Sequence, residues 1–336
     1  MKNILVTGGL GYIGSHTVVE LLNNSYNVII VDNLSNSSIV VLSRIEKITG
    51  TKPRFFNLDI NDDSLDEIFK ECQIDAVIHF AAYKAVGESV ENPLKYYQNN
   101  ITASIKLFTV MQQNNVQTIV FSSSATVYGE PARTPIFEDF PLQSVSPYGF
   151  TKLAIEQLLQ DLYTAEKEWN IGILRYFNPV GAHESGLIGE DPNGIPNNLM
   201  PYISQVAVGK RKCLNIFGND YPTIDGTGVR DYIHVVDLAI GHVKALQYLS
   251  EKRELFIVNL GTGNGSSVLE VIVAFEKASG KMINYQFAPR RSGDVATCFA
   301  NCDLAYQLLG FKAELSLDKM CIDTWNWQSK NPNGFK

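Results

Sequence analysis

The chain has 336 residues, of which 45% are hydrophobic, and it carries a formal net charge of −7. That length and apolar content predict a large buried core divided between about two domains. The acidic balance argues against a general binder of nucleic acids or membrane surfaces, because such proteins usually carry an excess of Lys and Arg.

The sequence shows no signal for targeting or for metal binding. Met1-Lys2 leads directly into the apolar stretch Asn3–Thr7, which predicts a first core strand and not a signal peptide. No apolar run approaches the roughly 18 residues that a membrane span needs. The five cysteines include no C-x-x-C pair and the five histidines are scattered, so we expect reduced thiols, no metal site and a cytoplasmic protein.

Short apolar strands alternate with longer helical patterns in the first half of the chain. The strand candidates are β-branched and aromatic and alternate little between polar and apolar positions, as in strands that helices cover on both faces. They are Ile4–Val6, Val28–Val31, Phe55–Phe56, Ala76–Phe80, Thr118–Phe121 and Gly172–Phe177. This order predicts an α/β fold with a doubly wound parallel sheet of the Rossmann type, connected by right-handed crossovers.

After Phe177 the composition changes. Residues 178–198 contain so many Gly and Pro residues that we expect no regular element there. Later patterns predict helices near 198–209, 236–249 and 267–279 and a strand at Leu214–Phe217. We therefore expect a first domain in residues 1–178 and a smaller α/β domain in residues 179–336, although the helix near 236–249 could pack back on the first domain.

A glycine-rich turn follows the first predicted strand. Gly9, Gly11 and Gly14 satisfy G-x-G-x-x-G, and Gly8, Gly11 and Gly14 satisfy G-x-x-G-x-x-G. Such turns need glycine because they are tight, a pyrophosphate approaches the backbone, and the next helix packs close with free N–H groups at its N-terminus. Asp32 ends the second strand, where a carboxylate accepts hydrogen bonds from the adenosine ribose and repels a 2′-phosphate, which favours NAD over NADP.

Tyr148 and Lys152 form a Y-x-x-x-K pair on one face of a predicted helix. An ammonium about 4 Å from a phenol, at an effective dielectric of about 20, contributes about 4 kcal/mol, or about 3 pKa units, which would bring the tyrosine pKa near neutrality. Ser146-Pro147 supplies a helix N-cap and a first-turn proline just before the tyrosine. Ser124, at the end of the fifth strand, could then relay a proton between a substrate oxygen and the phenolate.

Motifs along essentially the whole chain resemble those of the UDP-glucose/UDP-galactose 4-epimerase family, within the extended short-chain dehydrogenases/reductases. They include TGGLGYIGSH from Thr7, SSSATVYGE from Ser122, SPYGFTKL from Ser146, LRYFNPVGAH from Leu174 and PRRSGD from Pro289. The resemblance implies reversible inversion of carbon 4 of a UDP-hexose through a transient 4-keto sugar and NADH. It also implies that NAD stays bound, that residues 1–178 bind it, that residues 179–336 bind the UDP-sugar, and that the protein is a homodimer.

The resemblance further assigns site residues to positions of this sequence. The catalytic set is Ser124, Tyr148 and Lys152. The NAD site comprises these three residues together with Gly8, Gly11, Tyr12, Ile13, Gly14, Asp32, Asn33, Leu34, Ser35, Asn36, Ser37, Asp59, Ile60, Phe80, Ala81, Ala82, Lys84, Asn99 and Phe177. The UDP-sugar site comprises Lys84, Ser124, Tyr148, Asn178, Asn198, Leu199, Asn215, Ile216, Phe217, Arg230, Tyr232, Arg291, Asp294 and Cys298. In this scheme the two arginines clamp the diphosphate, and Phe217 stacks on uracil.

Cys298 departs from the pattern of family members confined to UDP-glucose and UDP-galactose. Those members commonly carry a tyrosine at the matching position, beside the 2-substituent of the hexose. A thiol in place of a phenol frees volume for an N-acetyl group, so we expect that UDP-GlcNAc and UDP-GalNAc are also interconverted. The alternative is that Cys298 is a tolerated filler.

Three other functions stay open at this point. A sugar-nucleotide dehydratase needs an acid pair beside the proton relay, and the residues after Ser124, Ala125–Val127, include no carboxylate. A UDP-glucuronate 4-epimerase or decarboxylase would need extra cations for the C6 carboxylate. A catalytically inactive NAD-binding regulator is disfavoured because Ser124, Tyr148 and Lys152 occur together.

Overall fold

Seven parallel strands form one sheet, in the order β10-β6-β5-β4-β1-β2-β3, in a computed structural model that describes residues 2–291 and 293–336. They are β1 (Asn3–Thr7), β2 (Asn27–Asp32), β3 (Arg54–Asn57), β4 (Ala76–His79), β5 (Thr118–Ser124), β6 (Asn170–Tyr176) and β10 (Leu255–Leu260). All pairings within this sheet are parallel, and six of the strands lie at the ranges that the sequence predicts.

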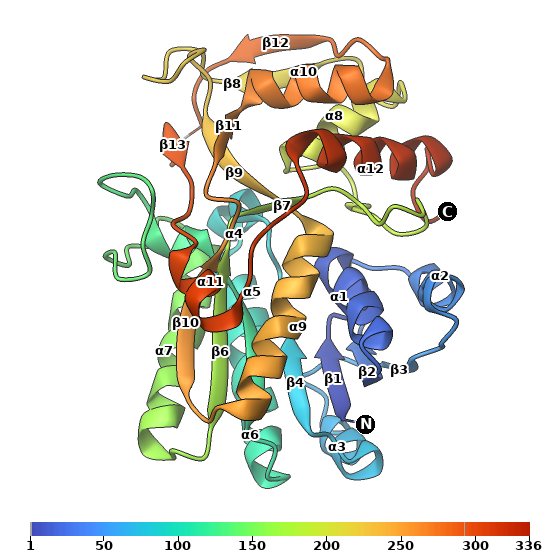
Figure 1. Cartoon of the computed structure of the whole chain (residues 1–336), viewed down its shortest axis with the longest axis vertical. Coiled ribbons are helices and arrows are strands. Elements are labelled where there is room, and N and C mark those ends of the chain that lie inside the picture. The colour runs from blue at the N-terminus through green and yellow to red at the C-terminus, as the bar shows by residue number, and fades with distance from the viewer. Residues whose placement is uncertain (1, 292) are drawn as a thin grey trace.

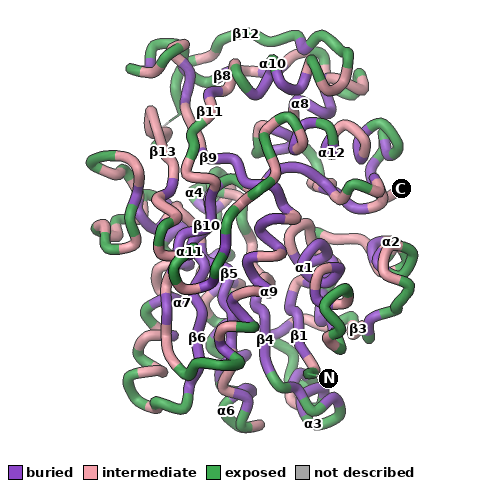
Figure 2. The backbone as a smooth tube through the Cα atoms, in the orientation of Figure 1, coloured by how far each residue is buried: buried purple, intermediate pink, exposed green. Residues whose placement is uncertain are grey.

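Helices cover both faces of this sheet, which explains why the central residues of its strands are mostly apolar. Ile4 and Val6 of β1 belong to one core cluster, and Leu5 belongs to another on the opposite face, because successive side chains of a strand point to opposite faces. The covering helices are α1 (Tyr12–Asn23), α2 (Val40–Thr49) and α9 (Val235–Glu251) on the first face, and α3 (Leu65–Cys72), α6 (Ala103–Gln113) and α7 (Pro147–Ala165) on the second. Figure 2 shows the inner strands β1, β4, β5 and β6 mainly in the colour of buried residues, whereas the edge strand β3 is more exposed. The predicted doubly wound α/β fold is confirmed.

A smaller part of the chain lies beyond the carboxyl ends of the large sheet (Figure 1). Its strands are β7 (Asn178–Val180), β8 (Leu214–Phe217), β9 (Val229–His234), β11 (Gly265–Ser267), β12 (Tyr285–Ala288) and β13 (Thr297–Cys298). Strand β9 pairs with β7, β11 and β13, and β8 pairs with β12. A third core cluster joins β7, β8 and β9 to α8 (Leu199–Ala207), α10 (Val268–Ser279) and α12 (Leu317–Lys330). Helices α8 and α10 and strand β8 lie close to the predicted ranges. The expectation of no regular element in residues 178–198 is wrong for Asn178–Val180, which form β7 because they pair with β9.

The chain returns to the large sheet after residue 234. Helix α9 packs against α1, and β10 pairs with β6, with Ile257 opposite Ile173. Helix α11 (Asp303–Leu309) in turn contacts α9 and β10. The expected second domain included residues 255–260, which instead form the seventh strand of the first sheet. The physical reason is that Phe256, Val258 and Leu260 are buried in the same core cluster as β1.

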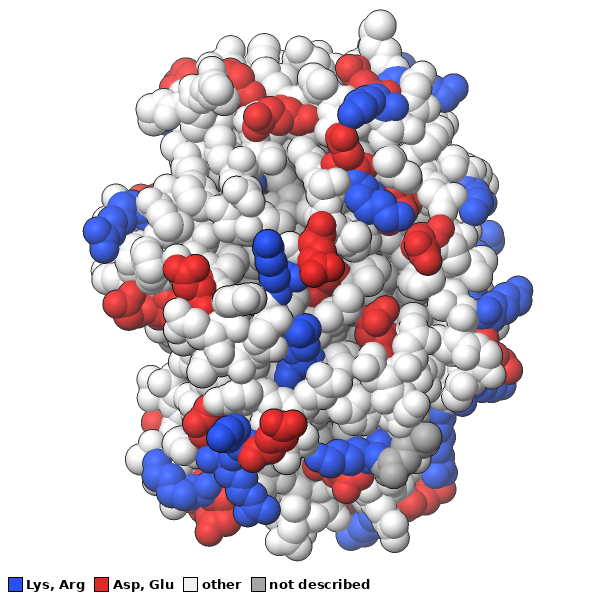
Figure 3. Space-filling view, viewed as in Figure 1, with Lys and Arg blue, Asp and Glu red and all other residues white. Residues whose placement is uncertain are grey.

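Two features of the described chain bear on its partners. No helix in the part of the chain that the structure describes has the length and apolar content required to span a membrane. Within residues 2–291 and 293–336, no group of His, Cys, Asp and Glu side chains is arranged to hold a metal ion. On the face drawn in Figure 3, acidic and basic side chains are interspersed.

Candidate active site

The glycine turn brings the N-terminus of α1 to the carboxyl edge of β1. Gly8 has φ +69°, which favours glycine. A Cβ atom on Gly14 would overlap the carbonyl oxygen of Gly8, so this contact between helix and turn also requires glycine. Gly11 precedes α1 and no side chain caps the helix, which leaves backbone N–H groups of its first turn available to an anion. Ile13 packs partly against the core.

Asp32 shapes the loop that follows β2. One of its carboxylate oxygens accepts hydrogen bonds from the Leu34 N–H at 2.9 Å and the Ser37 hydroxyl at 2.7 Å. The other accepts one from the Leu10 N–H at 3.0 Å. Each carboxylate oxygen has two lone pairs. The second oxygen therefore keeps a lone pair for a ribose hydroxyl.

The loop after β3 meets the loop after β2. The Asn33 side chain donates a hydrogen bond to Asp59 at 2.7 Å. Burial raises the pKa of Asp59, but hydrogen bonds from Asn61 and Asn33 outweigh it and hold the pKa below its usual value. Ile60 is buried, whereas Ser35 and Asn36 are exposed next to this pair. The residues expected around adenosine therefore lie on two adjacent loops.

Asn100 fixes the segment expected beside the nicotinamide. This residue lies on the π-helix η1 (Tyr97–Thr102), a form that often marks functional sites. Its side-chain oxygen accepts hydrogen bonds from the Tyr83 N–H at 2.8 Å and the Asn99 amide at 3.0 Å. Its amide donates to the Thr151 hydroxyl of α7 at 3.0 Å. Asn100 thus joins the loop after β4, which carries Phe80, Ala81, Ala82 and Lys84, to the helix that carries Tyr148 and Lys152. Sequence reasoning missed it, since only the neighbouring Asn99 was singled out.

Ser124 and Tyr148 come together because α7 begins close to the end of β5. The Ser146 hydroxyl accepts a hydrogen bond from the Gly149 N–H at 3.1 Å, which confirms the predicted N-cap. A Cβ atom on Gly149 would lie 3.0 Å from the carbonyl oxygen of Thr126, two residues after Ser124. Glycine therefore permits the close approach of this helix turn to the catalytic serine.

The electrostatics of Tyr148 differ from the expectation. Burial raises its pKa to about 12, and a hydrogen bond with Ser124 opposes this shift only in part. The Lys152 ammonium donates to the Ser122 carbonyl at 2.8 Å and lies 5.0 Å from the centre of the Phe121 ring. Burial lowers the pKa of Lys152 to about 7, against an opposing effect of Glu156. The prediction that Lys152 brings the pKa of Tyr148 near neutrality is therefore wrong for the protein groups alone, because burial outweighs the opposing hydrogen bond with Ser124.

On the smaller part of the chain, a cationic site is built from three segments. Arg291 donates a hydrogen bond to Asp294 at 2.8 Å, and Arg230 of β9 lies 3.7 Å from the same carboxylate. The Arg291 guanidinium is 4.9 Å from the centre of the Phe217 ring. Burial raises the pKa of Tyr232 to about 12, although both arginines oppose it. Two guanidinium groups share one carboxylate, so the site keeps an excess positive charge.

Cys298 and Asn178 flank this cationic site. Strand β13 places Cys298 opposite Arg230, and β7 places Asn178 opposite Tyr232. Burial raises the pKa of Cys298 to about 11, although Arg230 opposes the shift, so the thiol is protonated near neutral pH. Cys298 therefore presents a neutral, compact side chain next to the cations.

Glu190 connects two further expected residues. Its carboxylate lies 3.5 Å from the Lys84 ammonium and accepts a hydrogen bond from the Asn198 amide at 3.0 Å. Sequence reasoning missed Glu190, which lies in the Gly- and Pro-rich stretch. Leu199 is the first residue of α8, directly after Asn198.

Four expected residues have side chains that contact other parts of the protein. Ile216 is 1% exposed and faces the core, and its strand pairs with β12, where it lies opposite Phe287. The Asn215 amide oxygen accepts a hydrogen bond from Gln286 at 2.8 Å. The Tyr12 hydroxyl donates to the carbonyl oxygen of Gly181 at 2.7 Å, and Phe177 is buried with Val127 and Tyr128.

The protein combines a dinucleotide-type glycine turn, a Ser–Tyr–Lys set at one edge of the sheet, and a cationic site beyond that edge. These features are typical of one class of protein, the extended short-chain dehydrogenases/reductases that act on nucleotide sugars. The model of the family described as GDP-mannose 4,6 dehydratase matches residues 5–324.

Within that class, the chain belongs to the UDP-glucose 4-epimerase family. It is 60% identical over 334 residues to the UDP-glucose 4-epimerase of Bacillus subtilis (strain 168), covering 99% of this chain and 98% of that protein. It is 58% identical to the enzyme of Drosophila melanogaster, with the same coverage of both chains. The solved structure of the Stenotrophomonas maltophila epimerase with bound NAD and formylated UDP-arabinopyranose has a TM-score of 0.97 at 53% identity, covering 99% of each chain. That of Bifidobacterium longum with NAD+ and UDP has a TM-score of 0.96 at 54% identity, covering 99% of this chain and 100% of that one.

Proposed function

We propose that this protein interconverts UDP-hexoses that differ in configuration at carbon 4, with NAD bound throughout the cycle. The observation that carries the proposal is the placement of Ser124 and Tyr148 at the sheet edge where the glycine turn lies, with the cationic site of Arg230 and Arg291 on the part of the chain beyond that edge. Such a site holds the nucleotide diphosphate firmly by charge. The hexose, in contrast, needs freedom to turn over.

The residues present fit NAD. The N–H groups of α1 face the place for a pyrophosphate, Gly8 and Gly14 permit close approach, and Asp32 keeps a lone pair for the ribose. When bound, NAD supplies the acceptor and donor of the C4 hydride and a positive charge near the phenol.

The chain's own residues handle the proton. Tyr148 accepts the proton of the sugar 4-hydroxyl at its phenolic oxygen, and Ser124, which can both donate and accept, passes it. Lys152 contributes positive charge to the same helix face. After the keto sugar has turned, Tyr148 returns the proton to the inverted alkoxide.

Elimination chemistry is disfavoured, although the matched family model is described as a dehydratase. The residues after Ser124 form the 3-10 helix η2 (Ala125–Tyr128), which carries no carboxylate. The nearest hydrogen-bond partner of Ser124 there is Thr126, whose hydroxyl donates at 3.0 Å. Thr126 cannot play the part of the acid that protonates a departing hydroxyl.

The substrate range is proposed to include UDP-GlcNAc and UDP-GalNAc. The support is the position of Cys298 directly opposite Arg230, with a side chain much smaller than the tyrosine expected of the narrower enzymes. A UDP-glucuronate reaction lacks comparable support, because Arg230 and Arg291 are both assigned to the diphosphate.

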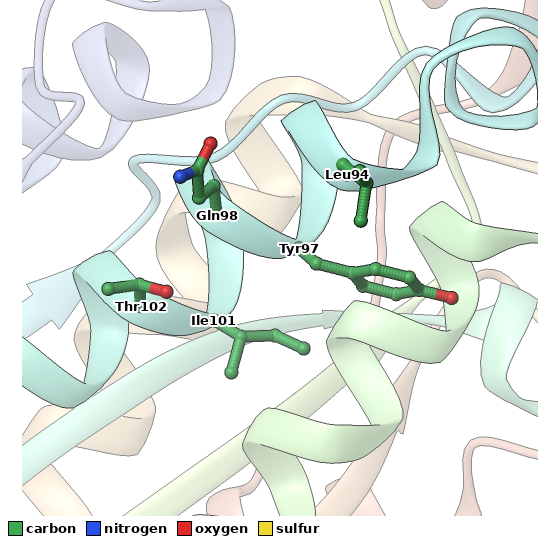
Figure 4. Close-up of a pocket in the computed structure, with 5 residues that line it drawn as sticks. All are labelled: Leu94, Tyr97, Gln98, Ile101 and Thr102. Carbon is green, nitrogen blue, oxygen red and sulfur yellow. The ribbon is translucent and has the colours of Figure 1, made fainter.

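We also propose a homodimer in the cytoplasm. Exposed apolar side chains gather on α4 (Val86–Glu91), α5 (Pro93–Tyr96) and α7, and Leu94 is 77% exposed. Figure 4 shows Leu94, Tyr97 and Ile101 bordering a shallow pocket beside α7. A second copy would cover this face on both chains at once. The five free thiols agree with a reducing compartment. Leu94→Glu should convert the dimer to a monomer in light scattering, and a wild-type mass equal to one chain would refute the dimer.

The test of the proposed reaction is direct. Purified protein is incubated with UDP-galactose and no added NAD, and UDP-glucose is measured. Formation of UDP-glucose supports the proposal. Failure even when NAD is supplied would refute it and favour an inactive NAD-binding regulator.

A further inference from the structure

A buried ion pair lies beneath the catalytic residues. Glu156 lies on α7 one turn after Lys152, and Arg175 lies near the end of β6. Their side chains are 0% and 2% exposed. The Arg175 guanidinium donates to one Glu156 oxygen at 3.0 Å and to the other at 2.6 Å. This bidentate contact keeps both side chains charged and fixes their orientation relative to each other.

The same carboxylate also holds β5. The Ser123 hydroxyl donates a hydrogen bond to Glu156. Ser123 lies between Ser122, whose carbonyl oxygen accepts the hydrogen bond from the Lys152 ammonium, and Ser124. A shift of Ser123 would therefore move two catalytic contacts together.

A second set of hydrogen bonds connects Arg175 to groups other than Glu156. Arg175 donates hydrogen bonds to the Tyr128 hydroxyl and to the carbonyl oxygen of Glu138, both at 3.0 Å. The Tyr128 hydroxyl donates to the Asn259 side chain of β10 at 2.7 Å. The pair thus connects the catalytic helix to the loop around residue 138 and to the edge strand of the sheet.

This second set of hydrogen bonds continues to the segment that carries Cys298. The Asn259 amide donates to the carbonyl oxygen of Ile136 at 2.9 Å. The Ile136 N–H donates to the carbonyl oxygen of Phe299 at 2.9 Å, and Phe299 directly follows Cys298. Hydrogen bonds therefore run from α7 to the proposed sugar site through buried groups.

We propose that Glu156 and Arg175 are a positioning pair, which fixes the end of β5 against α7 so that Ser124 and Lys152 stay aligned for proton transfer, and which ties this alignment to the Cys298 segment. The inference rests on the proposed epimerase function. Buried ion pairs are weak stabilisers compared with apolar residues of similar volume. Orientation of the catalytic groups is a role that apolar residues at these positions could not perform.

The pair also has an electrostatic consequence. The negative charge of Glu156 raises the pKa of Lys152, against the larger lowering by burial. The other ionisable groups around Lys152 are Tyr148 on α7, Tyr96 on α5, Tyr176 and Arg175 on β6, and His79 on β4. Burial raises the pKa of each tyrosine and lowers that of His79 to about 3, so these groups stay neutral near pH 7. Loss of Glu156 should therefore let Lys152 deprotonate at lower pH.

The experiment uses the full-length protein with its bound NAD. Glu156→Gln alone would leave the Arg175 charge buried without a partner, so the double variant Glu156→Gln/Arg175→Met is the main test. We expect it to fold, to retain NAD, and to keep its KM for UDP-galactose. Its kcat should fall about 100-fold. The alkaline limb of its pH–rate profile should move to lower pH, by less than in Glu156→Gln alone, because removal of the Arg175 charge opposes the shift.

Two single variants separate charge from geometry. Asp161→Asn removes a negative charge from an exposed position of the same helix and should leave kcat and the pH profile unchanged. Glu156→Asp keeps the charge but shortens the side chain that makes the bidentate contact, so it should restore the alkaline limb while kcat stays low.

The results for these variants distinguish a positioning role of the pair from a purely structural one. A folded double variant with wild-type kcat and pH profile would overturn the positioning role, as would the same pH shift in Asp161→Asn. If the double variant does not fold, the kcat of Glu156→Asp is the test. A wild-type kcat in that variant would refute the positioning role of the pair. A wild-type protein that converts no UDP-galactose would refute the proposed function instead.

Discussion

Replacing Lys152 by Met tests how the Tyr148 phenol becomes a base. Burial raises the pKa of Tyr148 to about 12, which at pH 8 leaves about one phenol in ten thousand ionised. A positive charge about 4 Å away, at an effective dielectric of about 20, lowers a phenol pKa by about 3 units. Lys152 lies one helical turn from Tyr148. Because burial lowers the pKa of Lys152 to about 7, this charge is present chiefly below that pH. Its removal should therefore lower kcat by up to about 1000-fold at about pH 6, and by less at higher pH.

The assay is kcat with UDP-galactose between about pH 6 and pH 10. In Lys152→Met the rate should keep rising about tenfold per pH unit, because the phenol stays un-ionised over this range. Lys167→Met, at an exposed lysine just after α7, is the control and should keep the wild-type profile. An unchanged pH optimum in Lys152→Met would refute the role of Lys152 as a modulator of the phenol.

Stability gives an independent readout of the same lysine. Burial lowers the pKa of Lys152 from 10.5 to about 7, so between these values the unfolded chain binds one more proton than the folded chain. The free energy of unfolding should then rise with pH through this window in the wild type. The rise should be smaller in Lys152→Met, and thermal melts at several pH values measure it. An equal rise in both proteins would contradict burial of the charge.

Four further substitutions have distinct expected outcomes. Gly14→Ala should lose bound NAD, because a Cβ would overlap the Gly8 carbonyl; NAD retained on purification would contradict this. Tyr148→Phe should bind NAD and UDP but lose about 100-fold or more of kcat, and near-normal turnover would exclude the phenol as proton acceptor. Arg291→Gln should weaken UDP binding about 10- to 100-fold in calorimetry, whereas Arg290→Gln, at an arginine paired with Asp220, should not. Cys298→Tyr should abolish UDP-GlcNAc turnover but keep UDP-galactose turnover, and unchanged turnover of both would refute the volume hypothesis.

Local sequence patterns predict much of the fold. The strands of the first half, the Ser146 cap and the Rossmann order follow from β-branched runs, a serine–proline pair and the alternation of elements. Strand β10 could not be placed in the same way. Leu255–Leu260 is an apolar run like the others, but its pairing with β6 depends on where α9 leads the chain, which is a property of tertiary packing.

The candidate site shows a similar limit. Motifs indicate which side chains bear the chemistry, and the structure brings Arg230, Arg291 and Asp294 together. Supporting groups such as Asn100 and Glu190 have no local signature, because their partners are distant in the sequence. The pKa of Tyr148 was beyond prediction for another reason, since it depends on the balance between burial and nearby charge.

The proposed catalytic cycle requires that a hydride leaves C4 of the sugar and returns to the same carbon while the sugar nucleotide stays bound. The most direct measurement supplies UDP-galactose deuterated at C4 to the purified protein, without added NAD, and analyses the UDP-glucose by mass spectrometry and NMR. If the hydride returns to the carbon that it left, the UDP-glucose should retain deuterium at C4. Replacement of the label by solvent hydrogen would contradict it.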